Sequence, residues 1–232
     1  MRPHRAYVES LAPELRLTGP EAHHLAEVLR ARVGDTLTVF DGQGREGRAR
    51  VVELGRGWVR LRLEETWTAD REPPQPVVLY LPLLKGDHMA EVVRAATELG
   101  AGRIVPILTQ HCVVRELSEN KLLRLRRVAQ EAAKQCGRSV VPQVEPLRTL
   151  EQVPPVAQGL VAHPYARARV REVYDPTRPV ALLTGPEGGL AEAEVALLER
   201  RGFAPVALGP RILRAETAPL ALLSLVTAGE GF

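Results

Sequence analysis

Hydrophobic and polar residues alternate through the first third of the chain, which is the pattern of strands with one buried face. The alternation is clearest at residues 36–40, 48–52 and 58–63, and a short helical pattern interrupts it at residues 20–30. Residues 41–44, Asp-Gly-Gln-Gly, join two of these runs as a hairpin turn. The pattern predicts a small β-barrel over residues 1–67.

A different pattern begins after a proline-rich segment. Residues 68–76 contain three prolines and no apolar period, so they are predicted to form a linker. Strand and helix patterns then alternate, with strands at 77–81, 104–108, 159–162, 180–183 and 206–208 and the clearest helices at 87–99 and 118–135. This alternation predicts an α/β domain over residues 77–232, with a mostly parallel sheet.

Two loops rich in glycine and proline follow strands near the end of the chain. They are residues 182–189, Leu-Leu-Thr-Gly-Pro-Glu-Gly-Gly, and residues 208–218, Leu-Gly-Pro-Arg-Ile-Leu-Arg-Ala-Glu-Thr-Ala. Open α/β sheets bind ligands at the carboxyl ends of their strands, and glycine lets the backbone approach a ligand closely. We therefore expect a pocket that contacts its ligand mainly through backbone groups.

Polar residues lie where the second loop leads into a nearly all-apolar helix over residues 219–228. A helix that is apolar on every side is buried, so Arg214, Glu216 and Thr217 are expected at the mouth of a core element. The alternative is that Glu216 and Thr217 cap the helix and Arg214 is a surface charge.

The composition excludes several classes of protein. The 232 residues, 45% of them hydrophobic, suit one large domain or two small ones. No apolar run approaches the roughly 18 to 20 residues that span a bilayer, and the N-terminus lacks an apolar signal stretch, so a cytoplasmic location is expected. Cys112 and Cys136 form no C-x-x-C pair, so neither a disulfide framework nor a metal site is expected. His111 and His163 lie near strand ends and stay candidate site residues.

Basic residues are clustered although the net charge is only +3. One group, near the helix at 118–135, comprises Lys121, Arg124, Arg126, Arg127, Lys134 and Arg138, and a second group, on the barrel strands, comprises Arg45, Arg48, Arg50, Arg56, Arg60 and Arg62. Such clusters bind the phosphates of nucleic acids. The alternative is two solvated faces of an arginine-rich protein.

One motif is discounted. Residues 42–47 fit the dinucleotide fingerprint G-x-G-x-x-G, but a strand follows them where that fingerprint requires a helix. The chain contains neither a phosphate-binding G-x-x-x-x-G-K-[ST] loop nor a G-x-S-x-G nucleophile turn. A nicotinamide enzyme, a P-loop enzyme and a serine hydrolase are therefore not expected.

Six blocks of the sequence resemble, nearly end to end, the RsmE family of 16S ribosomal RNA (uracil-N3)-methyltransferases of the SPOUT class. The blocks are residues 84–86, 97–100, 104–106, 131–138, 185–189 and 208–217. The chain departs from the family pattern at Ala95, where lysine is usual, and at Lys134 and Cys136, where glutamate and serine are usual. These departures concern details of RNA contact rather than the reaction.

The resemblance implies a PUA-like, RNA-binding barrel followed by a methyltransferase domain whose chain forms a deep trefoil knot. It further implies a homodimer, with the apolar helix at 219–228 in its interface. The cofactor would be S-adenosyl-L-methionine, bound in the knot. The substrate would be N3 of one uridine in the 16S ribosomal RNA of the small ribosomal subunit, with no membrane and no metal involved.

Site residues follow from the same resemblance together with the chemistry of the reaction. Uracil N3 carries a proton that must leave, so Arg214 is expected to stabilise negative charge on the uracil carbonyls, and Glu216, or a water that it holds, to accept the proton. The expected cofactor contacts are Leu160, Ala162, His163, Leu183, Thr184, Gly185, Glu187, Gly188, Leu208, Gly209, Ile212, Leu213, Thr217 and Ala218. The expected RNA contacts are Arg5, Arg30, Arg32, Lys85, Lys134, Gln135 and Arg138.

Two alternative functions stay open. The chain could be a SPOUT methyltransferase acting on another ribosomal or transfer RNA nucleotide. It could also be a non-catalytic RNA-binding protein, although that would leave the two glycine-rich loops without a purpose.

Overall fold

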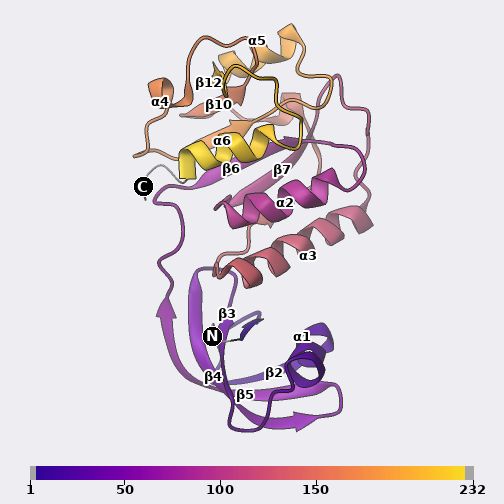
Figure 1. Ribbon diagram of the computed structural model, residues 1–232, viewed down its shortest axis with the longest axis vertical. Helices are drawn as coiled ribbons and strands as arrows, with labels where there is room; N and C mark the ends of the chain where they lie inside the picture. Colours follow the sequence, from indigo (N-terminus) through magenta and orange to yellow (C-terminus); the bar gives the residue numbers. More distant parts are fainter. Residues whose placement is uncertain (1–3, 228–232) are drawn as a thin grey trace. The chain divides into compact units, whose positions relative to one another are not determined.

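The computed structural model describes residues 4–227, which divide into two compact units (Figure 1). The first unit contains the chain up to Glu72 together with residues 133–141, and the second contains residues 73–132 and the chain from Pro142 onward. The sequence pattern placed residues 133–141 with the α/β domain. The chain therefore contributes to the first unit twice.

A five-stranded sheet forms the first unit. Its strands are β1 (Arg5–Tyr7), β2 (Glu14–Thr18), β3 (Thr36–Phe40), β4 (Arg45–Gly55) and β5 (Trp58–Thr68), in the order β1-β3-β4-β5-β2. Only the pair β1–β3 is parallel. Alternate residues such as Leu15, Val39 and Leu61 face one buried core, as the sequence pattern predicts. The hairpin turn predicted at residues 41–44 is confirmed between β3 and β4.

The helical segment predicted at residues 20–30 is present and ends in an unusual way. The α-helix α1 (Gly19–His23) continues as a π-helix, η1 (His24–Val28). The N–H of Leu29 donates to the carbonyl of His24 at 2.9 Å. Arg30 follows in the left-handed region, with φ of +52°, which residues other than glycine rarely adopt.

A seven-stranded parallel sheet is the centre of the second unit. Its strands are β6 (Val77–Pro82), β7 (Arg103–Leu108), β8 (Gln143–Val144), β9 (Arg148–Thr149), β10 (Gly159–Ala162), β11 (Val180–Leu183) and β12 (Phe203–Val206). The order is β12-β10-β11-β6-β7-β8, and β9 also pairs with β7. This confirms the predicted mostly parallel α/β fold. The strand predicted at 206–208 is wrong, because β12 lies three residues earlier.

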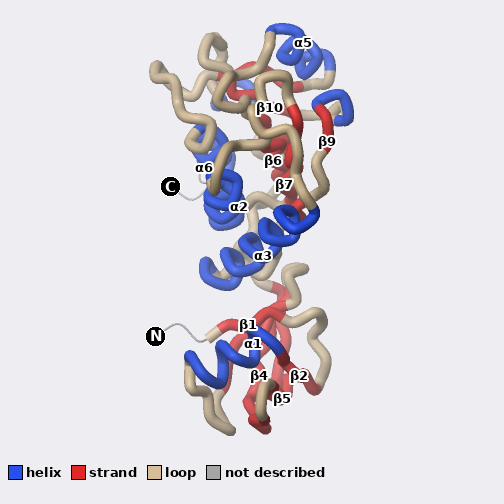
Figure 2. Tube along the Cα trace, turned by 90° about the vertical axis from the view of Figure 1, so that its right-hand side faces the viewer, coloured by secondary structure: helices blue, strands red, loops and turns tan. Residues whose placement is uncertain are grey.

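Helices cover both faces of this sheet. They are α2 (His88–Glu98), α3 (Glu119–Cys136), α4 (Val170–Val173), α5 (Glu192–Arg200) and α6 (Ala218–Thr227), with a short 3₁₀ turn, η2 (Leu150–Gln152). The helix α6 packs against α2, α4 and three central strands, whereas α5 packs against β12 and contributes Leu198 to the core. Figure 2 shows α2 and α6 on one side of the sheet and α5 on the other. The predicted helix at 219–228 corresponds to α6, and residue 228 lies outside the described residues.

Gly100 ends α2 as the sequence predicts. Its φ of +96° is a conformation that an L-residue adopts only with strain, and a Cβ there would lie 2.7 Å from the Pro73 ring. Both a left-handed backbone and close packing therefore require glycine at this position.

Both glycine-rich loops occupy the expected place in the sheet. The first follows β11 and the second connects β12 to α6, so they leave neighbouring parts of the same sheet edge. The trefoil knot implied by the family resemblance stays a prediction.

Candidate active site

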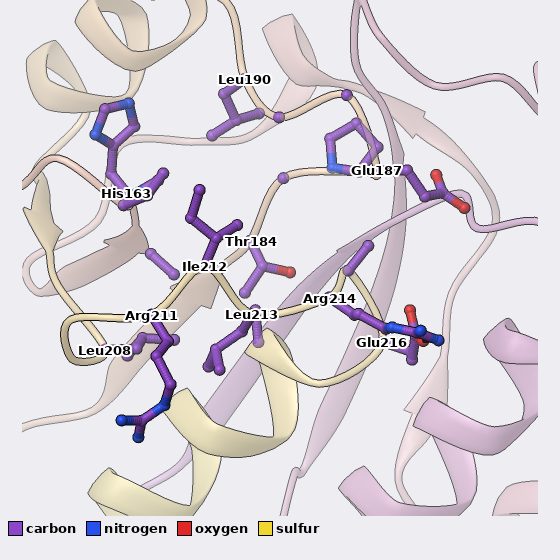
Figure 3. Close-up of a pocket in the computed structure, with 18 of the residues that line it drawn as sticks. His163, Thr184, Glu187, Leu190, Leu208, Arg211, Ile212, Leu213, Arg214 and Glu216 are labelled. Atoms are coloured by element: carbon purple, nitrogen blue, oxygen red, sulfur yellow. Dashed lines mark ion pairs between the residues drawn. The ribbon is translucent and has the colours of Figure 1, made fainter.

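A cavity of about 750 Å³ opens at the carboxyl ends of β10, β11 and β12. Its walls come from three strand-end segments: residues 162–165, residues 184–190, and residues 208–218 without Pro210 and Thr217 (Figure 3). Lys85, from the loop before α2, and His88, the first residue of α2, also line it. The volume falls within the range of about 300 to 1,000 Å³ that is typical of ligand pockets. The position is the one at which open α/β sheets bind ligands.

One polar group in the wall lacks a partner. Thr184 is completely buried, and within residues 4–227 its Oγ1 has no hydrogen-bond partner. Figure 3 shows its side chain in the middle of the cavity wall. A buried hydroxyl without a partner costs free energy, so this group fits a ligand that would donate or accept a hydrogen bond there.

Three of the charged side chains in the wall lie together at one end of the cavity. Arg214 Nη1 lies 3.8 Å from Glu216 Oε1, and the Arg214 side chain is 84% exposed. In Figure 3, Glu187, Arg214 and Glu216 lie on one side, and His163 lies on the opposite side. The ring of His163 lies 6.0 Å from that of Tyr165, and the guanidinium of Arg211 also points away from Glu216. We call the end with Glu187, Arg214 and Glu216 the charged end; the rest of the wall carries the two rings and the arginine.

Contacts across long sequence separations hold the first glycine-rich loop in place. The Lys85 N–H donates to Glu187 Oε1 at 3.2 Å, and His111 Nδ1 lies 3.2 Å from the carbonyl of Gly189. A Cβ on Gly188 would come within 2.8 Å of the His111 Cβ, so the loop and His111 are packed as closely as glycine allows. His111 thus supports the loop from outside, because it is not among the residues that line the cavity.

Most of the residues expected to hold the cofactor line this cavity. Those that do are Ala162, His163, Thr184, Gly185, Glu187, Gly188, Leu208, Gly209, Ile212, Leu213 and Ala218, together with Arg214 and Glu216. Leu160 and Leu183 do not, because both are buried within strands of the sheet. Thr217 is exposed at the start of α6 and also lies outside the lining.

Some lining residues were not expected. They are His88, Pro164, Tyr165, Pro186, Gly189, Leu190, Arg211 and Ala215. Most are neighbours of expected residues in the same loops, so the loop pattern could have included them. His88 comes from another part of the chain, and no local sequence signal connects it to the cavity.

Three of the expected RNA contacts are occupied by ion pairs of the first unit. Arg5 binds Glu46 at 2.7 Å and Lys134 binds Glu21 at 2.9 Å. Arg138 binds Glu72, and the Arg138 side chain is only 5% exposed. The other expected RNA contacts are exposed, namely Gln135, Arg30, Arg32 and Lys85. The basic strand cluster is likewise largely paired, since Arg48 and Arg50 share Glu64 and Arg60 binds Glu53. Pairing lowers the charge that these residues offer to a phosphate.

Glu46 is the centre of the paired region. It is 1% exposed and accepts hydrogen bonds from Arg5, Arg71, Trp67 and Ser139. Burial alone would raise the pKa of Glu46, but the hydrogen bonds from Ser139, Arg5 and Arg71, with the Coulombic attraction of Arg5, outweigh it and lower that pKa to about 2. The ionised carboxylate of Glu46 therefore links three segments, which are the start of the chain, the segment after β5 and the segment after α3.

Two negative findings hold for residues 4–227. No group of three or more His, Cys, Asp or Glu side chains is arranged to bind a metal ion. No helix in that range is long and apolar enough to cross a membrane.

Comparisons with known proteins find related proteins for both units. Residues 71–227 match the family described as an RNA methyltransferase domain, and residues 17–64 match the RNA methyltransferase PUA domain. Ribosomal RNA small subunit methyltransferase E of Synechocystis is 36% identical, over 96% of this chain and 78% of its own length. The protein of the same name from Bacillus subtilis is 31% identical, over 93% and 90%. A crystal structure of ribosomal RNA small subunit methyltransferase E from Neisseria gonorrhoeae, bound to S-adenosyl methionine, superposes with a TM-score of 0.87 at 30% identity and covers 98% of both chains.

Proposed function

The chain belongs to the family of ribosomal RNA small subunit methyltransferase E, and we propose that it methylates N3 of one uridine in 16S ribosomal RNA. It is an S-adenosylmethionine-dependent ribosomal RNA methyltransferase, as its relatives and the cofactor-bound structure of one of them establish. The observation that carries the finer proposal is the charged end of the strand-end cavity, where Arg214 and Glu216 lie together.

The cavity fits the cofactor in size and in chemistry. Its two glycine-rich loops offer backbone groups, and Leu208 and Leu213 offer apolar surface. Within residues 4–227 the buried Thr184 hydroxyl has no hydrogen-bond partner, so it can form one with a ligand. These are features that an adenine and a ribose require from a pocket. When bound, S-adenosylmethionine supplies a methyl group activated by a positively charged sulfur.

Arg214 is the residue that we assign to charge stabilisation. As the N3 proton leaves, negative charge develops on the uracil carbonyl oxygens, and a guanidinium can donate hydrogen bonds to them. The 84% exposed side chain is accessible to a base arriving from outside. Its Nη1 lies 3.8 Å from Glu216 Oε1, so the two charged groups are neighbours.

Glu216 is the residue that we assign to proton acceptance, directly or through a water that it holds. Its side chain is 24% exposed and lies beside the group that would bind the uracil carbonyls. A base placed within hydrogen-bond reach of the imide proton is what the reaction requires. Because N3 lies on the Watson–Crick edge, the target base must be unpaired or flipped out of its helix.

The two units divide the work in this proposal. The first unit, matched by the PUA family, binds RNA, and the second unit carries the methyl transfer. We also propose that the protein works in the cytoplasm as a homodimer. Supporting the dimer, Leu225 of α6 is 52% exposed and Val173 of the adjoining α4 is 39% exposed, which leaves apolar surface at a helix pair.

Mass mapping of methyl groups tests the reaction and the site together. Small-subunit RNA and assembled small subunits are incubated with labelled S-adenosylmethionine and the unchanged protein, Arg214→Ala or Arg211→Ala. Arg211 is a matched control, because it lines the same cavity but Figure 3 shows its guanidinium pointing away from Glu216. We expect one new methyl group on uridine N3, and about a 100- to 1,000-fold slower turnover only in Arg214→Ala, with cofactor affinity kept.

Other outcomes would revise the proposal at different points. A methyl group on another ribosomal or transfer RNA nucleotide would keep the enzyme class and change the substrate. Equal loss of turnover and of cofactor affinity in Arg214→Ala would remove the assignment of Arg214 to charge stabilisation.

A further inference from the structure

The arginines of the first unit fall into two groups. Most of them form ion pairs with carboxylates of the same unit, namely Arg5, Arg48, Arg50, Arg60, Arg62, Arg71 and Arg138. An RNA phosphate that approached these guanidinium groups would have to compete with a carboxylate already in place. The strands of the sheet are therefore a poor place to look for RNA contacts.

Residues 28–34, which we call the 28–34 turn, are different. Arg30 and Arg32 are both exposed, and within residues 4–227 neither guanidinium forms an ion pair with a carboxylate. They lie two residues apart between η1 and β3, so two guanidinium groups without an ion-pair partner meet in one short segment. A segment of this kind attracts the phosphates of a nucleic acid.

The backbone of the 28–34 turn is fixed by hydrogen bonds. The Ala31 N–H donates to the Leu25 carbonyl at 3.0 Å, the Arg32 N–H to Asp35 Oδ2 at 2.7 Å, and the Gly34 N–H to the Val51 carbonyl at 2.9 Å. The π-helix before the turn and the left-handed Arg30 are both rare, and rare backbone conformations cluster at functional sites. The turn is thus built in advance, and little backbone entropy would be lost on binding.

Apolar side chains accompany the two cations. Val28 is 59% exposed and Val33 is 63% exposed, which is unusual for valine. Single-stranded RNA presents both charged phosphates and the apolar faces of unstacked bases. Cations and exposed apolar side chains in one rigid turn match that combination.

We propose that the 28–34 turn is the principal RNA-binding element of the first unit. Arg30 and Arg32 bind phosphates beside the target uridine, and Val28 and Val33 pack against unpaired bases. The proposal rests on the proposed function, because it takes ribosomal RNA as the partner. It assigns the RNA contact to a preformed turn rather than to the basic strands.

The test compares the full-length protein with two double variants of equal charge loss. In Arg30→Gly/Arg32→Ala, glycine tolerates the φ of +52°, so the turn keeps its shape while both guanidinium groups are lost. In Arg45→Ala/Arg56→Ala, two exposed arginines are removed from the first residue of β4 and from the turn between β4 and β5, and within residues 4–227 neither forms an ion pair with a carboxylate. Binding of a small-subunit RNA transcript is measured at salt concentrations from about 50 to 200 mM.

We expect the 28–34 variant to bind at least about tenfold more weakly at low salt. Two lost phosphate contacts should also flatten the slope of log K against log salt by about 1.4 to 1.8. Arg45→Ala/Arg56→Ala should bind nearly as the unchanged protein does, and Arg30→Lys/Arg32→Lys should recover most of the slope. Val28→Ser/Val33→Ser should weaken binding without a change of slope.

Three results would overturn the proposal: no RNA binding by the unchanged protein, unchanged binding by Arg30→Gly/Arg32→Ala, or equal weakening in Arg45→Ala/Arg56→Ala. Unchanged affinity in Val28→Ser/Val33→Ser would overturn the part that concerns bases. Methyl transfer is measured on the same samples. If the unchanged protein binds RNA through the turn but transfers no methyl group, the proposed function fails while the RNA contact stands.

Discussion

Replacement of Glu46 by glutamine should destabilise the first unit strongly at neutral pH and hardly at all in acid. The pKa of Glu46 falls from 4.5 to about 2 in the folded protein, because the hydrogen bonds from Ser139, Arg5 and Arg71 outweigh the opposite effect of burial. Each pKa unit corresponds to about 1.4 kcal/mol, so the folded state gains about 3 kcal/mol from the ionised carboxylate. Glu46→Gln removes that contribution and leaves Arg5 and Arg71 without their anion.

The pH dependence has a definite direction. Since the folded pKa is the lower one, the stabilisation is complete above about pH 4.5 and is lost as the pH falls toward 2. The free energies of unfolding of the unchanged protein and of Glu46→Gln should therefore differ by about 3 kcal/mol at pH 7 and converge near pH 2.

Tryptophan fluorescence is the suitable assay. Trp58 and Trp67 are the only tryptophans of the sequence, and both belong to the first unit, so their signal reports its unfolding in the full-length chain. Denaturant titrations from pH 7 down to pH 3 would give the difference at each pH. Glu64→Gln is the control, because Glu64 also pairs with two arginines but is exposed, and its effect should be far smaller. A difference that does not change with pH would refute the reasoning.

Three further variants test the cavity and the dimer. Thr184→Val should raise the melting temperature, because it removes a buried hydroxyl without a partner. The same variant should bind S-adenosylmethionine about tenfold more weakly by calorimetry. Unchanged affinity would exclude the hydroxyl as a cofactor contact. Gly188→Ala should lower both stability and cofactor affinity, because the added Cβ would lie 2.8 Å from the His111 Cβ. Adding His111→Gly to the same chain should restore part of the affinity. No recovery would mean that the loop is held by other contacts. Leu225→Glu should convert a dimer into monomers in analytical ultracentrifugation without loss of cofactor binding, and an unchanged mass would remove α6 from the interface.

The sequence predicts the local features well. The alternation of strands and helices, the hairpin at residues 41–44 and the end of α2 at Gly100 depend on nearby residues, and the structure confirms them. The strand β12 was misplaced because Pro205 argues against a strand in its own sequence. Its position at the edge of the sheet explains why the proline is tolerated, since one side of an edge strand needs no ladder hydrogen bond.

Long-range pairing is what the sequence could not reveal. The ion-pair partners of Arg5, Lys134 and Arg138 lie 41, 113 and 66 residues away in the sequence. No local pattern distinguishes a basic side chain that forms an ion pair from one that does not. His88 reaches the cavity for the same kind of reason, because only the folded loop before α2 places it there. The strand-end loops could be recognised, whereas the neighbours that fold onto them could not.

The Glu46 cluster also determines how much of the chain must be synthesised before the first unit can be completed. Its donors include Ser139, so the cluster is incomplete until the ribosome has passed position 139 of the 232 residues. Until then the nascent chain holds the strands of the first unit but lacks one of the donors that keep the pKa of Glu46 low. We expect that a product terminated before α3 is complete does not form a stable RNA-binding fragment.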